Sequence, residues 1–226
     1  MTLQVVLRGS DGVVIASDRS VSLQLNPIAF TDRNSKLVVK SRFVCTFAGD
    51  DCAKYISTEL VEAKKDDSVF ESSANFIEAV NGALRKYKEG QWPFFKTQPR
   101  KILWVQFGSP EFTIWAATYW ACTESFELCD NSDSVFAGDE ANPARYFVEH
   151  YYRKNPMKTV SGLKKMAAHV ILTGHIFNSG GVDGLEMVIG NSGGFTQVSS
   201  EERQELEKIS RKIHAANDAY FSDCVA

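Results

Sequence analysis

The chain has 226 residues, of which 44% are hydrophobic, and this size and composition predict one domain with a substantial core over residues 1–226. The formal net charge of −3 argues against a nucleic-acid partner and against a polybasic membrane patch. No run of about 20 apolar residues could span a bilayer, and no secretory signal opens the chain, so we expect a cytoplasmic protein.

The first predicted element is a β-hairpin. Two apolar runs, 3–7 and 13–16, flank the turn Gly9-Ser10-Asp11-Gly12. Because Thr2 is small, we expect removal of Met1, which leaves a threonine with both a hydroxyl and a free α-amine. The amine, with an ordinary pKa of about 7.7–8.0, can accept the hydroxyl proton and make the alcohol a nucleophile.

Charged residues that would assist this chemistry follow on the next strands. Asp18 ends the second strand, and Lys36 starts a third within a hairpin of 36–39 and 43–47. A buried lysine beside the Thr2 hydroxyl favours the alkoxide and lowers the pKa of the amine, while Asp18 would hold that lysine in place. Gly49 would let a backbone N–H approach an oxyanion.

The remaining pattern alternates short strands with amphipathic helices. We predict a loop at 20–34 and a terminal helix at 201–221 with Leu206, Ile209, Ile213, Ala216 and Tyr220 inward. Between them the predicted elements are, in chain order, helices at 52–65 (capped by Asp50 or Asp51) and from Ser72 or Ser73 to Gly90, strands at 102–107, 112–120, 124–129 and 134–137, helices at 142–153 and 159–173, and strands at 185–189 and 195–198. This order favours an α+β fold with two sheets between helical layers.

Other motifs have simpler interpretations. Gly190-Asn191-Ser192-Gly193-Gly194 matches the nucleophile-elbow pattern, but a strand follows it and His214 is on a helix, which argues against a Ser192 triad. His150, His169 and His175 lack metal-ligand spacing, and the five cysteines lack a disulfide framework and a zinc pattern. The aromatic residues 92–95, 115, 119 and 120 form either a subunit contact or, more simply, core packing.

The order of the N-terminal motifs resembles the proteasome β-type subunits and their bacterial relatives, the HslV-like peptidases and the ancestral β-subunit (Anbu) proteins. The motifs are a threonine at the start of a strand, followed by the segments Val14–Arg19, Ser35–Leu37, Phe47–Gly49 and His175–Gly181. The resemblance implies the four-layer αββα sandwich of the N-terminal-nucleophile (Ntn) hydrolases.

The resemblance also implies roles for individual residues. Thr2 would be the nucleophile, Asp18 and Lys36 its electrostatic partners, and Gly49 the oxyanion donor, with Ser179 bonded to the N-terminal amine. The implied activity is that of a threonine peptidase that hydrolyses a peptide or amide bond of a peptide or protein substrate, and it needs no metal or organic cofactor. The implied partners are further copies of the same chain, assembled in a ring or spiral. An ATPase or unfoldase is an additional partner that the resemblance allows.

A second reading is a non-catalytic assembly subunit that keeps the fold and has lost the site. Ile176 stands where active members carry an aspartate, and Ala137-Gly138-Asp139-Glu140 stands where they carry Ser-Gly. In this reading Asp18 and Lys36 form a structural ion pair, and Ser179 is a turn residue. The mass of the N-terminus and labelling of Thr2 discriminate between the two hypotheses.

Overall fold

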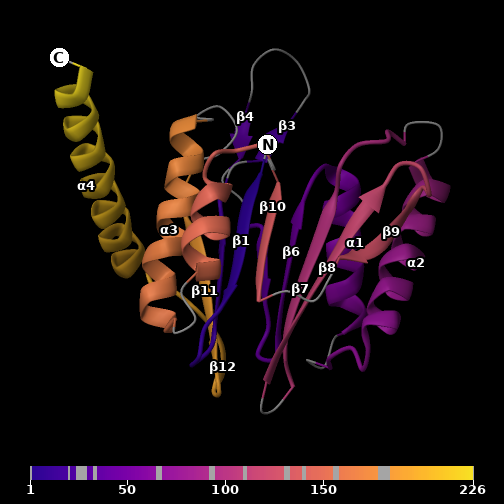
Figure 1. Ribbon diagram of the computed structural model, residues 1–226. Coiled ribbons are helices and arrows are strands. Elements are labelled where there is room, and N and C mark those ends of the chain that lie inside the picture. The colour runs from indigo at the N-terminus through magenta and orange to yellow at the C-terminus, as the bar shows by residue number, and fades with distance from the viewer. Residues whose placement is uncertain are drawn as a thin grey trace.

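Two five-stranded antiparallel sheets form the centre of the molecule, and helices lie on their outer sides (Figure 1). The computed structural model describes residues 2–19, 21–23, 30–32, 35–64, 68–91, 95–108, 111–129, 133–138, 141–154, 158–177 and 184–225. This arrangement confirms the predicted mixture of two sheets with helices. None of the helices in these ranges combines the length and the apolar character needed to cross a bilayer.

The first sheet contains the N-terminal hairpin. Its strand order is β10-β1-β2-β11-β12, with β1 at Leu3–Arg8, β2 at Val13–Ser17, β10 at Ser134–Gly138, β11 at Glu186–Asn191 and β12 at Gly194–Gln197. β1 pairs with both β2 and β10, so the start of the chain lies inside the sheet and not at its edge. Backbone pairing on both sides therefore fixes the position of the residues next to Thr2.

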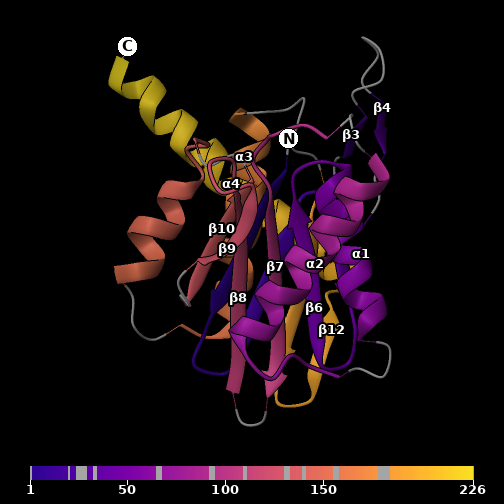
Figure 2. The ribbon, with the colours of Figure 1, turned by 90° about the vertical axis from the view of Figure 1, so that its right-hand side faces the viewer.

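The second sheet follows the chain from β5 to β9 without a crossover. Its strands are β5 at Leu37–Val39, β6 at Phe43–Ala48, β7 at Lys101–Gly108, β8 at Glu111–Trp120 and β9 at Ser125–Cys129. Helices α1 (Asp51–Ala63) and α2 (Ser73–Gln91) cover its outer face (Figure 2). Trp115 and Tyr119 are buried in this layer, as core packing predicts, whereas Trp120 is 47% exposed.

Successive side chains of a strand point to opposite faces of its sheet, and this divides the core into two outer clusters and one cluster between the sheets. On β1, Leu3, Val5 and Leu7 face α3 (Val160–Phe177), while Val6 faces the second sheet. Gln4 also faces the second sheet, where its amide donates to Thr46 Oγ1 at 2.6 Å. Thr2 has the same parity as Gln4, and so the space between the sheets is where its side chain is expected.

Three segments differ from the sequence-based expectation or decide between its alternatives. The predicted loop 20–34 contains two short paired strands, β3 at Val21–Leu23 and β4 at Phe30–Asp32. The predicted helix at 142–153 is largely a π-helix, η1, at Phe147–Tyr152. The first helix is capped by Asp50, whose side chain accepts from Ala53 N at 3.4 Å, and this confirms one of the two predicted caps.

The inward face of α4 (Ser200–Val225) was predicted correctly at Leu206 but incorrectly at Ile213 and Ala216, and the side chain of Tyr220 lies outside the described part of the structure. Ile213 is 43% exposed and Ala216 is exposed, whereas Leu206 and Ser210 are buried. The reason is a polar stripe that faces α3: Ser210 Oγ lies 2.9 Å from His169 Nδ1, and His214 Nε2 lies 3.1 Å from Thr173 Oγ1. These hydrogen bonds turn the helix away from its apolar stripe, and its C-terminal half extends beyond the body of the molecule (Figure 1).

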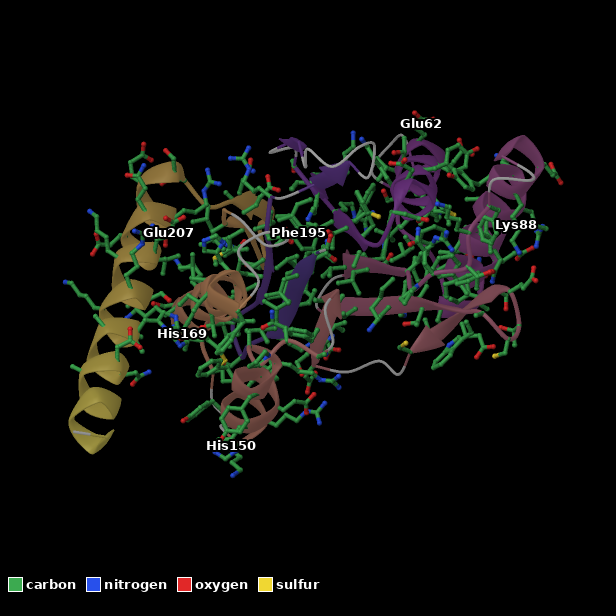
Figure 3. The ribbon with its side chains drawn as sticks, turned by 90° about the horizontal axis from the view of Figure 1, so that it is seen from above. Glu62, Lys88, His150, His169, Phe195 and Glu207 are labelled. Atoms are coloured by element: carbon green, nitrogen blue, oxygen red, sulfur yellow. The ribbon has the colours of Figure 1, made fainter. Side chains whose placement is uncertain are left out.

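His169 makes the packing of α4 on α3 sensitive to acid. The His169 and His214 rings stack with centroids 4.6 Å apart, and Figure 3 shows His169 between the two helices. Burial, together with the nearby His214, lowers the pKa of His169 to about 4, so the folded state disfavours its protonation.

We therefore expect the free energy of unfolding to fall as the pH drops from about 6.5 to about 4, by up to about 3 kcal/mol from this residue, because the unfolded chain binds the proton more readily. Urea denaturation at several pH values measures this loss. His169→Gln, which keeps a hydrogen-bonding side chain that does not titrate, should lose less stability over this range. Parallel pH curves for the two proteins would contradict the prediction.

Candidate active site at the N-terminus

Thr2, Asp18 and Lys36 come together at one end of the space between the sheets. The Lys36 ammonium donates to Thr2 Oγ1 at 3.1 Å and to Asp18 Oδ2 at 2.8 Å. The three side chains come from the starts of β1 and β5 and from the end of β2, and they are separated by up to 34 positions in the sequence. The sequence-based expectation that these residues lie together agrees with this geometry.

All three groups are shielded from water. Asp18 is 0%, Lys36 2% and Thr2 8% exposed. Burial lowers the pKa of the Lys36 ammonium below its ordinary value, and the carboxylates of Asp18 and Glu186 oppose this effect. Because the surroundings are buried, the local dielectric constant is lower than that of water, and electrostatic interactions are stronger there. The positive charge of Lys36 therefore has a larger effect on the Thr2 hydroxyl than it would have in water.

Backbone contacts fix Asp18 relative to the start of β1. Its Oδ1 accepts from Leu3 N at 2.7 Å, and its own N–H donates to Leu3 O at 3.0 Å. Asp18 therefore bridges the Lys36 ammonium and the peptide group that follows Thr2. A carboxylate held at both oxygens cannot rotate without losing a contact, and so the lysine has a fixed acceptor.

Gly49 lies at the same end of the molecule. β5 and β6 run antiparallel with Leu37 opposite Thr46, which brings the residues after β6 near the start of β5. Gly49 has φ +136°, a conformation that glycine adopts readily, and it precedes the α1 cap residue Asp50. Arg100 holds Asp50 with two hydrogen bonds of 2.6 Å, and this anchors the turn that carries the Gly49 N–H.

Gly138 packs directly on the backbone of Thr2, a contact that the sequence did not reveal. A Cβ at Gly138 would lie 1.7 Å from the backbone oxygen of Thr2, and the residue has φ +108°. The end of β10 therefore fits against Thr2 only without a side chain.

We expect Gly138→Ala to lower the free energy of unfolding by more than about 2 kcal/mol and to reduce labelling of Thr2, because backbone must move to relieve the overlap. Urea denaturation measures the loss. Gly108→Ala is the matched control, since among the described residues, its chain neighbours aside, no atom lies within 4 Å of the added Cβ, and its effect should stay within about 0.5 kcal/mol. Equal effects at both glycines would show that the contact with Thr2 is unimportant.

Other residues that the sequence analysis considered are either not described by the structure or lie in different surroundings. Met1, Ser179, Asp139 and Glu140 lie outside the described residues. Ile176, at the end of α3, is 56% exposed. Ser192 lies in the tight turn between β11 and β12, which is a hairpin and not a nucleophile elbow.

Glu186 is the site residue that sequence reasoning missed. It is 3% exposed, and its carboxylate accepts from the backbone N–H of Lys36 at 3.3 Å. The signal was a single glutamate inside the apolar run Leu185–Ile189, where a buried acid is unusual. In the part of the chain that the structure describes, no group of three or more histidine, cysteine or acidic side chains is arranged to hold a metal ion.

Anbu proteins are among the solved structures that share this overall fold. An Anbu (Gly-1) mutant from Hyphomicrobium sp. strain MC1 superimposes with a TM-score of 0.70 at 14% identity, over 100% of both chains. Anbu (ancestral beta-subunit) from Yersinia bercovieri gives 0.70 at 11% identity, over 97% of this chain and 96% of that one. The chain has the Anbu fold.

A third match supports the same assignment. Anbu from Hyphomicrobium sp. strain MC1 aligns at 13% identity over 97% of both chains with a TM-score of 0.69. The sequence matches no family model and no curated protein, so the likeness to Anbu is one of structure. It confirms the proteasome-like fold that the N-terminal motifs predicted.

Proposed function

We propose that this Anbu-like chain is an Ntn hydrolase that cleaves peptide or amide bonds with Thr2 as its nucleophile, after removal of Met1. In this proposal residues 1–226 form one domain, and the two sheets with their outer helices are the four-layer αββα sandwich of that class. The observation that carries the proposal is the contact between Lys36 Nζ and Thr2 Oγ1, 3.1 Å long and shielded from water.

The proposed chemistry proceeds through an acyl-enzyme. The free α-amine of Thr2, directly or through one water, takes the hydroxyl proton while Oγ1 bonds to the substrate carbonyl carbon. The resulting tetrahedral oxyanion collapses, the carbon–nitrogen bond breaks, and the leaving amine receives the proton from the α-ammonium group of Thr2. Water then attacks the ester on Oγ1 with the same amine as base, which releases the acid product and restores Thr2.

Electrostatic stabilisation comes from groups that are already fixed before reaction. Lys36, oriented by Asp18, favours negative charge on Oγ1, and the Gly49 N–H would donate to the oxyanion. Ser179 would hold the amine of Thr2. This chemistry uses no metal and no organic cofactor.

We further propose that the protein works as an assembly of its own copies in the cytoplasm, a ring or spiral that restricts access to Thr2. Peptide or unfolded protein is the substrate class, and an ATPase that feeds such an assembly is compatible with the proposal. Size-exclusion chromatography with light scattering checks the assembly, since a monomer at all concentrations would contradict it.

The decisive test uses mass spectrometry and an electrophile. A peptide epoxyketone is suitable because its ketone and epoxide carbons can bond to the hydroxyl and the amine of one N-terminal residue. We expect the purified protein to lack Met1 and to gain one adduct, located on Thr2. A protein that keeps Met1 and gains no adduct would contradict the proposal.

The second candidate is a non-catalytic assembly subunit with the same fold. It is favoured by Ile176, an exposed side chain without a hydrogen-bonding group, and by Ala137 and Gly138, which supply no hydroxyl next to Thr2. In that case the Asp18–Lys36 pair only stabilises the fold. The same labelling experiment separates the candidates, because the assembly subunit would form its oligomer and remain unlabelled.

A further inference from the structure

Glu186 introduces a second carboxylate beside Lys36. It is the first residue of β11, and pairing with β2 brings it opposite Ser17, the residue before Asp18. On β11, Val188 faces the space between the sheets and Met187 faces the helices, so Glu186 has the parity of Val188. A carboxylate at 3% exposure in this position is costly unless polar partners satisfy it.

Those partners come from both sheets. Oε2 accepts from the backbone N–H of Lys36 at 3.3 Å, and Oε1 accepts from Gln197 Nε2 on β12 at 3.1 Å. The first contact joins the first sheet to the residue that precedes β5 of the second sheet. Glu186 therefore ties down the peptide group from which the Lys36 side chain extends.

The same carboxylate also acts on the charge of Lys36. Asp18 holds the ammonium directly, and Glu186 adds a second negative charge from another strand. Both carboxylates oppose the loss of the proton that burial favours. The two acids contact different parts of Lys36. Asp18 accepts a hydrogen bond from the ammonium at the end of the Lys36 side chain, and Glu186 accepts one from the Lys36 backbone N–H.

We propose that Glu186 is a positioning residue of the Thr2 site, whose carboxylate fixes the backbone of Lys36 and keeps its side chain in the ammonium form. The inference rests on the proposed function for its catalytic meaning, because only an ammonium at this place can favour the Thr2 alkoxide. Its effect on Lys36 itself does not depend on whether Thr2 reacts.

The test is a titration of Lys36 followed by NMR on the full chain. Carbon-13 at the lysine Cε reports protonation, and Lys36→Arg identifies the Lys36 signal by its disappearance. In Glu186→Gln, which keeps the shape and an oxygen acceptor but removes the charge, we expect the pKa of Lys36 to fall relative to the unchanged protein. Glu202→Gln on α4, which removes an acid that pairs with Lys164, is the matched control and should leave the Lys36 titration unchanged.

A second readout connects the titration to the reaction. At a pH on the alkaline side of the rate profile, epoxyketone labelling of Thr2 should be slower in Glu186→Gln than in the unchanged protein, because a smaller fraction of Lys36 is then protonated. The loss should be smaller at lower pH, where Lys36 is protonated in both proteins. A merely structural role would lower the rate equally at every pH, and that result would contradict the inference.

The outcomes for the two proposals are separable. An unchanged Lys36 titration in folded Glu186→Gln overturns the inference, while labelling of Thr2 in the same protein would leave the proposed function intact. If Glu186→Gln lowers the Lys36 pKa but neither protein is ever labelled at Thr2, the result supports the role of Glu186 and contradicts the proposed hydrolase function. If Glu186→Gln does not fold, Glu186→Asp, whose side chain is one methylene shorter, must show a lower Lys36 pKa than the unchanged protein, and an unchanged Lys36 pKa overturns the inference.

Discussion

Replacing Thr2 by alanine is expected to abolish epoxyketone labelling and to lower amide hydrolysis by at least about 10³-fold, since removal of a nucleophile leaves only binding and oxyanion stabilisation. Alanine is small, so removal of Met1 proceeds as before, and the variant keeps the free α-amine. The Lys36 ammonium would then lack the Thr2 Oγ1 contact but keep Asp18, so the fold should be retained. Mass spectrometry and a fluorogenic peptide assay measure the two losses.

Thr2→Ser is the matched control. Serine keeps the oxygen and the amine on one residue and loses only the methyl group, so labelling should persist. Adducts that survive in Thr2→Ala would have to come from another nucleophile. The exposed Cys122 is the first site to check by peptide mapping.

Replacing Lys36 by methionine is expected to lower the free energy of unfolding by about 3–5 kcal/mol, because the Asp18 carboxylate stays buried without its cation. The same change should abolish labelling of Thr2. Lys208→Met removes the cation of an exposed pair with Glu205 and should cost less than about 1 kcal/mol. Urea denaturation measures both changes.

The double variant Asp18→Asn with Lys36→Met separates stability from chemistry. It removes both charges, and asparagine keeps an oxygen that can accept from Leu3 N, so most of the stability should return. Labelling should not return, because no ammonium faces Thr2. Stability losses that simply add would show that the two side chains are not coupled, and labelling of either variant would exclude Lys36 from the mechanism.

The sequence was sufficient for the features that local patterns determine. The N-terminal hairpin, the hairpin that begins at Lys36 and the order of strands and helices follow from the alternation of apolar and polar residues, from turn residues and from helical periodicity. For the cap of α1 the sequence left Asp50 and Asp51 open, and the structure decided for Asp50. The grouping of Thr2, Asp18 and Lys36 followed from the resemblance, since no local rule brings residues on β1, β2 and β5 to one point.

Tertiary contacts decided what the sequence could not predict. The orientation of α4 depends on hydrogen bonds from Ser210 and His214 to α3, which outweigh its apolar stripe. The role of Glu186 could not be predicted from its own apolar strand, because its hydrogen-bond partners are distant in the sequence: Lys36 precedes β5 and Gln197 lies on β12. In the sequence, the segment that starts Ala137-Gly138 showed only the lack of a serine hydroxyl, and only the geometry reveals that Gly138 leaves room for the Thr2 backbone.

The most direct test of the central claim is the intact mass of the purified protein before and after reaction with a peptide epoxyketone, followed by mapping of the adduct. The account predicts a mass lower than that of the full sequence by one methionine residue, and a single adduct joined to both the oxygen and the nitrogen of Thr2. A protein that retains Met1 and stays unlabelled, or an adduct on any other residue, would contradict it.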